Sequence, residues 1–170
     1  SEAFRGCEQL NAINLDNAKI TSLGTGVFGD CRSMTNEFVN GVLENYAANA
    51  NGEIKKIPAY LFFGCNGQEG HDGTVANKNK CTFTALNIPE QFSEIGDGAF
   101  ASTGDAVIKL NTITVNRNMA PTCRQGETDE YANITNKKVF DGLEANLTTV
   151  IFKEAATGWE KTETTGFLTY

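Results

Sequence analysis

Two short apolar patterns recur along the chain in a constant phase, and this repeat constrains the fold more than any other feature. The first, apolar-x-x-apolar-x-x-x-apolar-Phe, is most complete at residues 20–28. The second, apolar-x-x-apolar-x-apolar, follows it after a variable interval. Such a repeat is typical of a solenoid, in which each unit forms one coil. Further copies of the first pattern lie at residues 54–62 and 92–100, and copies of the second at 10–15, 83–88, 110–115 and 147–152.

Each coil is predicted to contribute one β-strand, because the last two apolar positions of the second pattern alternate with an outward-facing residue. Strands of successive coils would pair in parallel about 4.8 Å apart. One coil cannot enclose a core, whereas three or more stacked coils can. We therefore expect a single domain, with a solenoid over residues 1–152 and a cap at 153–170. Its coils, about five, are expected at residues 1–19, 20–53, 54–91, 92–116 and 117–152.

The apolar positions of both patterns should point into one shared column and form the core. The expected core residues are Phe4, Leu10, Ile13, Leu15, Ile20, Leu23, Phe28, Ile57, Phe62, Leu86, Ile88, Ile95, Phe100, Leu110, Ile113, Val115, Phe140, Leu147, Val150 and Phe152.

Two of these units resemble the BspA type of leucine-rich repeat. Residues 20–31 (Ile-Thr-Ser-Leu-Gly-Thr-Gly-Val-Phe-Gly-Asp-Cys) and 92–100 (Phe-Ser-Glu-Ile-Gly-Asp-Gly-Ala-Phe) are good copies of it. Its closing strand, which ends in proline, is matched by Leu-Asn-Ile-Pro at 86–89. The resemblance covers about four of the five expected units, and several copies that agree in phase make it specific.

This resemblance implies an α/β leucine-rich-repeat solenoid, a right-handed, horseshoe-like superhelix rich in β-structure. Its strands would be parallel, one per coil, with short helical or irregular inserts. The resemblance also implies a bacterial, Bacteroides-type protein at the cell surface or secreted, in a family where some members act as adhesins. Because the chain starts at Ser1 without a methionine, we expect any export signal to lie outside it. Trp159 is expected to cap the last coil, since it ends an alanine-x-x-x-tryptophan sequence similar to that family's closure.

The second coil departs from the repeat, because charged Glu37 stands where an apolar strand residue is expected. Apolar residues recur instead at helical spacing between Thr35 and Asn49, which predicts a short amphipathic helix. This helix could be a packing insert that covers one flank of the stack, or a dedicated binding helix. The third coil carries a polar insert at residues 68–80, which predicts an exposed loop.

Three of the five cysteines, Cys7, Cys31 and Cys65, share one phase of the repeat. We expect them to form a ladder of buried free thiols, although their spacing on neighbouring coils leaves disulfide bonding open. Cys81 and Cys123 are out of phase and could pair in an oxidising compartment. No Cys-x-x-Cys or Cys-x-x-His spacing occurs, so no metal site is predicted.

Residues suited to catalysis are scarce. His71 is the only histidine and lies in the 68–80 insert, flanked by glycines and carboxylates. A weak cation site or an enzyme centred on that loop is therefore one hypothesis, against a merely solvated loop tip. The glycines at 24 and 26 lack the spacing of a dinucleotide fingerprint and are interpreted as turn residues. No catalytic residue and no cofactor is predicted.

Charge and hydropathy exclude two classes of partner. The 14 basic and 21 acidic residues give a net charge of −7, which repels nucleic acid. No apolar run approaches the roughly 18 residues that a membrane-spanning helix needs, so no membrane span is predicted.

The favoured function is a non-catalytic binding module, an adhesin that presents a solenoid face to a host protein, a glycan or an envelope component. The alternatives are a structural spacer within a larger surface protein and the enzyme or cation site at residues 68–80. The residues expected to point outward from the strands and to contact the partner are Asn14, Thr84, Asn87, Thr112, Thr114 and Thr149.

Overall fold

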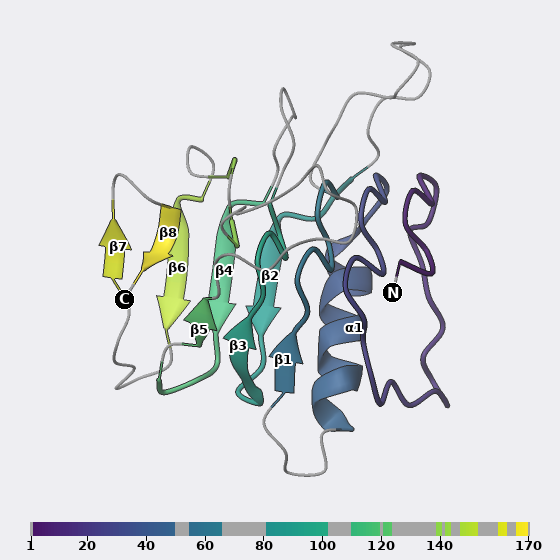
Figure 1. Cartoon of the computed structure of the whole chain (residues 1–170), viewed down its shortest axis with the longest axis horizontal. Coiled ribbons are helices and arrows are strands. Elements are labelled where there is room, and N and C mark those ends of the chain that lie inside the picture. Colours follow the sequence, from purple (N-terminus) through teal and green to yellow (C-terminus); the bar gives the residue numbers. More distant parts are fainter. Residues whose placement is uncertain are drawn as a thin grey trace.

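A computed structural model describes residues 2–49, 55–65, 81–101, 110–119, 121–123, 139–140, 142–143, 147–152, 160–162 and 166–169. Within these ranges the repeat units stack side by side along the long axis of the molecule (Figure 1). The described elements are α1 (Asn36–Ala48), β1 (Lys55–Ile57), β2 (Ala85–Ile88), β3 (Phe92–Ile95), β4 (Thr112–Val115), β5 (Thr122–Cys123), β6 (Thr149–Phe152), β7 (Glu160–Thr162) and β8 (Gly166–Thr169).

One sheet, in the order β2-β4-β6, contains three of the four strands predicted from the second apolar pattern. The fourth copy, at residues 10–15, forms no strand, because α1 lies where its partner strand would pair with it. Its strands are parallel, and their register pairs equivalent repeat positions. Leu86 aligns with Ile113, which aligns with Val150, and the next apolar positions align in the same way. The parallel pairing and its phase are therefore confirmed.

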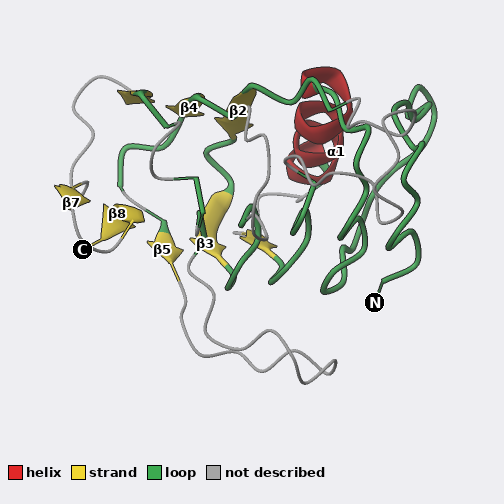
Figure 2. Cartoon of the chain, turned by 90° about the horizontal axis from the view of Figure 1, so that it is seen from above, coloured by secondary structure: helices red, strands yellow, loops and turns green. Residues whose placement is uncertain are grey.

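A second parallel sheet, in the order β1-β3-β5, was not predicted. The expectation of one strand per coil is wrong, because the coils expected at 54–91, 92–116 and 117–152 each contribute two. Figure 2 shows the two sheets as separate rows, with α1 in line with β2 and β4. In β3, Phe92 and Ile95 are buried and the two residues between them are half-buried. Because buried and half-buried residues do not alternate in β3, a search for strands by alternating apolar and polar residues misses this strand.

The segment around Cys123 belongs to this second sheet as β5. Glu94 aligns with Thr122, and Ile95 aligns with Cys123. Ile57 of β1 aligns with Ile95 in turn. Cys123 therefore aligns with Ile57 and Ile95 rather than with the repeat position that Cys7, Cys31 and Cys65 share, so it lies outside that cysteine phase, as predicted.

Stacked phenylalanine rings run through the coils, and we call them the phenylalanine ladder. Neighbouring rings are nearly parallel, with centroids 5.5–5.9 Å apart. Backbone hydrogen bonds join the same turns, as when Phe28 N donates to Leu61 O at 3.0 Å. Gly26 and Gly98, each two residues before a ladder phenylalanine, have φ of +62° and +56°, which explains the recurrent turn glycine. The ladder consists of Phe4, Phe28, Phe62, Phe100 and Phe140.

Two expected core residues lie at the surface instead. Phe4 is 45% exposed and Ile13 is 39% exposed. Phe4 lies in the first coil, which has a neighbouring coil on one side only in the described part of the chain, and such a unit buries less than one between two neighbours. Ile13 lies in the same coil and lines a groove between that coil and α1. Five others, namely Leu10, Leu15, Ile20, Leu23 and Val150, are partly buried against the core.

The remaining expected core residues are buried wherever the structure describes their side chains; the side chain of Phe152 lies outside the described set. The buried residues are Phe28, Ile57, Phe62, Leu86, Ile88, Ile95, Phe100, Leu110, Ile113, Val115, Phe140 and Leu147.

The helix predicted between Thr35 and Asn49 is confirmed as α1. Thr35 is its N-cap, and its side chain accepts a hydrogen bond from Phe38 N at 3.1 Å. One side of the helix is buried in the same core as the strands, through Phe38, Val39, Val42, Leu43, Tyr46 and Ala47.

The helix does not lie on a flank of the stack but within it, between the first coil and β2 (Figures 1 and 2). Asparagine side chains join it to both neighbours. Asn36 Oδ1 accepts from Thr84 N and Ala85 N at 2.7 and 3.0 Å. Asn40 accepts from Asn87 N at 2.8 Å and donates to Ala85 O at 3.0 Å. These side-chain amides form hydrogen bonds with backbone N–H and C=O groups at the edge of β2, as a neighbouring strand would.

A single residue, Asn45, makes the corresponding bonds on the other side of α1. Its Oδ1 accepts from Ile20 N at 2.9 Å, and its Nδ2 donates to Ala18 O at 2.9 Å. The helix therefore replaces the strand of the second coil and keeps the stack continuous.

Replacing Asn36 with alanine is expected to lower the free energy of unfolding by about 2 kcal/mol, because it leaves the N–H groups of Thr84 and Ala85 without their acceptor. Asn36→Asp keeps an acceptor oxygen in the first turn of the helix, where negative charge is favourable, and should cost less. Urea denaturation of both variants measures the difference. Equal losses in the two variants would show that the acceptor is not what stabilises the β2 edge.

The last elements, β7 and β8, pair with each other in antiparallel fashion. Trp159 and the 68–80 loop with His71 lie outside the described residues. Among the residues that the structure describes, no helix is both long and apolar enough to cross a bilayer.

Candidate binding surface

The outer side of the β2-β4-β6 sheet carries two rows of residues in register. Alternation along each strand buries Leu86 and Ile88 in β2 and turns the residues between and before them outward. We call these six outward residues the outer strand face. The first row is Ala85, Thr112 and Thr149, and the second row is Asn87, Thr114 and Ile151.

The outer strand face carries no charged side chain. Asn87, Thr112 and Thr114 are half-buried, whereas Thr149 is exposed and Ile151 is 49% exposed. Within the described part of the chain, the side chains of Asn87, Thr114 and Thr149 make no hydrogen bond. Their amide and hydroxyl groups can therefore donate to and accept from a partner. The exposed Ile151 adds apolar area to the same face, a contribution that sequence reasoning did not assign to binding.

Two residues expected on this face lie elsewhere. Thr84 precedes β2, and its hydroxyl accepts a hydrogen bond from Asn36 Nδ2 at 3.2 Å. Asn14 is exposed, but it lies on the first coil, on the far side of α1 from β2 (Figure 1). Its Oδ1 accepts from Asp16 N at 3.0 Å in a local turn. The helical insert separates Asn14 from the strands, because it occupies the place of the intervening strand.

Two cysteines of the expected thiol ladder are fully buried. Cys31 Sγ donates to Phe4 O at 3.0 Å, and Cys65 Sγ donates to Phe28 O at 2.9 Å. Each thiol thus contacts the preceding coil at its ladder phenylalanine. Burial raises the pKa of Cys31 to about 12 and raises that of Cys65 well above its ordinary value.

Cys7 contradicts the expected ladder, because it is exposed. It occupies the first coil, where one side of the turn is uncovered. Cys81 is buried, and none of Cys7, Cys31, Cys65 and Cys81 forms a disulfide bond.

These thiols are expected to differ in reactivity. In native protein at pH 8, Cys7 should be alkylated within minutes. Cys31, Cys65 and Cys81 should be modified only after unfolding, because burial hides them and a raised pKa suppresses the thiolate at Cys31 and Cys65. Peptide mass spectrometry after iodoacetamide treatment, with Cys7→Ser as the control, measures this. Native labelling of Cys31 at the rate of Cys7 would contradict the assignment.

The residues that the structure describes contain no candidate metal cluster. No group of three or more His, Cys, Asp or Glu side chains there could hold a metal ion. Charged side chains form ion pairs instead. Arg5 Nε lies 3.0 Å from Asp30 Oδ2 on the next coil, and Arg5 Nη1 lies 2.7 Å from Glu2 Oε1 on its own coil. The proposed site at residues 68–80 falls outside the described ranges.

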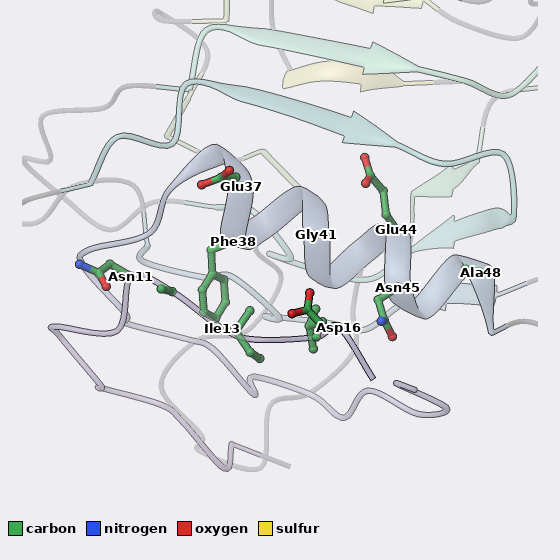
Figure 3. A pocket seen from close by; sticks show the side chains of 11 residues that line it. Asn11, Ile13, Asp16, Glu37, Phe38, Gly41, Glu44, Asn45 and Ala48 are labelled. Carbon is green, nitrogen blue, oxygen red and sulfur yellow. The ribbon is translucent and has the colours of Figure 1, made fainter. Parts of the chain in front are cut away.

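A groove of about 620 Å³ lies between the first coil and α1, and sequence reasoning did not predict it. Figure 3 shows Phe38 of α1 pointing toward Ile13 of the first coil, with Asp16 close by. One sequence feature could have indicated this groove: Glu37, Gly41 and Glu44 follow helical spacing and therefore share one face of the predicted helix.

A protein-family model matches most of the chain. The model of the BspA type Leucine rich repeat region matches residues 1–69 and 76–158, in six copies. The repeat phase alone predicted about five units in the same part of the chain. No curated protein and no solved structure matches.

Proposed function

The chain belongs to the BspA-type leucine-rich repeat family, and from this premise we propose that it is an adhesin-like binding module. Repeats of this family are generally binding modules, typically non-catalytic, in surface or secreted proteins. The family also implies a repeat solenoid. We place this chain at the bacterial surface or outside the cell, with its coils forming a right-handed superhelix.

The observation that carries the proposal is the outer strand face. Its rows are held on parallel strands about 4.8 Å apart, and the inward-facing residues of β2 and β4 beneath them are fully buried. A rigid array loses little conformational entropy on binding. Hydroxyl and amide groups beside the exposed Ile151 suit a protein or a glycan, both of which offer hydrogen-bonding groups next to apolar patches.

The test is a screen of the purified domain against immobilised extracellular-matrix proteins and glycans, with and without calcium. Thr114→Arg introduces a bulky charge at the centre of the face, and a saturable interaction should weaken about tenfold or more. Thr21→Arg makes the same substitution at an exposed position outside this face and should leave binding within about twofold. If the two variants bind with equal affinity, the partner contacts a surface other than the outer strand face. The absence of any saturable partner would favour the structural spacer.

A further inference from the structure

The groove between the first coil and α1 has the size of a ligand site. Its volume of about 620 Å³ falls within the range of pockets that bind small molecules or short peptide segments. Its apolar lining comes from both sides, and Ile13 is 39% exposed within it. The apolar lining residues are Ala12, Ile13, Leu15, Phe38, Gly41 and Ala48.

One exposed face of α1 forms a wall of the groove. Glu37, Gly41, Glu44 and Ala48 follow one another at spacings of three or four residues, so they share this face. Gly41 has no side chain, and a Cβ built there would meet no atom within 4 Å. The missing side chain hollows the middle of the face.

Residues 11–15 of the first coil form the facing wall, and their backbone is largely unpaired. In the described part of the chain, the N–H groups of residues 11–15 make no hydrogen bond. The carbonyls of Ala12, Ile13 and Asn14 likewise accept none there. The repeat places a strand at this position, but α1 stands where its partner strand would be. Unpaired backbone beside a helix is the arrangement to which an extended peptide can add as a strand.

The charge of the groove defines the partner further. Asp16, Glu37 and Glu44 line it, and all three are exposed. None of them forms an ion pair with a described residue, and no Lys or Arg lines the groove. Three carboxylates around an apolar floor complement a segment that alternates basic and apolar side chains.

We propose that this groove binds an extended basic peptide, which adds as a strand to residues 11–15 and lies against the Glu37–Gly41–Glu44 face of α1. The inference rests on the proposed function as a binding module, but it concerns a surface separate from the outer strand face. Backbone bonding gives the peptide its affinity, and the carboxylates select its charge.

The test uses three synthetic pentapeptides and isothermal titration calorimetry at low salt. The probe is Lys-Val-Lys-Val-Lys with blocked ends. Glu-Val-Glu-Val-Glu reverses the charge, and a backbone N-methylated Lys-Val-Lys-Val-Lys keeps the charge but cannot donate the strand hydrogen bonds. We expect saturable binding of the first peptide, and we expect each of the other two peptides to bind at least about tenfold more weakly.

Protein variants locate the site. Gly41→Leu fills the hollow at a position where an added Cβ meets nothing, so the helix should still fold, and binding should fall about tenfold or more. Glu37→Gln and Glu44→Gln should each weaken binding about threefold. Glu90→Gln makes the same charge change outside the groove, and it should bind as the unmodified protein does.

Several results would overturn the proposal: no binding of the lysine peptide, equal binding of the glutamate or N-methylated peptide, or full binding by Gly41→Leu. A dimer in analytical ultracentrifugation that Gly41→Leu dissolves would show that a second copy fills the groove instead. The Thr114→Arg variant separates the two proposals, because it should lose the partner of the outer strand face and still bind the lysine peptide.

Discussion

Replacing Phe62 with alanine is expected to lower the free energy of unfolding by about 4 kcal/mol, since it opens a cavity in the middle of the phenylalanine ladder. Phe62 is fully buried. Its ring stacks on Phe28 with centroids 5.5 Å apart and on Phe100 at 5.9 Å. Loss of the ring removes the contacts on both sides, and backbone hydrogen bonds that join the coils limit how far the neighbours can close the gap.

The matched control is Phe4→Ala, the same substitution at the end of the same ladder. Phe4 is 45% exposed and stacks on Phe28 alone, so we expect a loss of about 1 kcal/mol. Urea denaturation followed by circular dichroism gives both values. Similar losses of unfolding free energy for Phe62→Ala and Phe4→Ala would mean that the stacked rings do not stabilise the packing of one coil on the next.

Replacing Gly96 with alanine is expected to cost about 3 kcal/mol, because there is no room for the added methyl group. A Cβ at Gly96 would lie 2.4 Å from Ala59 N and 2.7 Å from Ala59 Cα. These are backbone atoms and cannot rotate away. Gly96 N also donates to Ile57 O at 2.8 Å, so the two coils would have to separate where they are bonded.

Gly41→Ala makes the same chemical change with the opposite expected sign. Its Cβ would meet nothing within 4 Å, and alanine is favoured over glycine inside a helix by about 1 kcal/mol. Thermal denaturation should therefore show a lower Tm for Gly96→Ala and a higher Tm for Gly41→Ala. Two changes of the same sign would contradict the close coil contact at Gly96.

The strand positions could be predicted because the same apolar pattern occurs several times along the chain. Leu86, Ile113 and Val150 occupy one position of the second pattern, and the sheet pairs them directly. When one unit stacks on its copies, equal positions must align, so phase alone gives the register. The helix was predictable for a similar local reason: Thr35 caps it, and its buried residues follow helical spacing.

The candidate site was predictable only in part. Asn87, Thr112, Thr114 and Thr149 lie on the outer strand face as the alternation predicts, whereas Thr84 and Asn14 do not. Alternation of apolar and polar residues predicts which side chains of a strand face outward. It does not predict whether the neighbouring coil contains a strand at all. The groove beside α1 depends on that second fact.

The sequence by itself determined three features: the repeat, the apolar residues that stack to form the core, and the register of the parallel strands. Each of them depends only on a unit and on neighbours that share the same apolar pattern. Only the tertiary structure decided that α1 takes the place of a strand and satisfies the β2 edge through Asn36 and Asn40. It also decided that Phe4, Cys7 and Ile13 lie at the surface. Edge pairing and exposure depend on what stands beside a unit, and contacts between residues some 25 to 49 positions apart leave no local pattern in the chain.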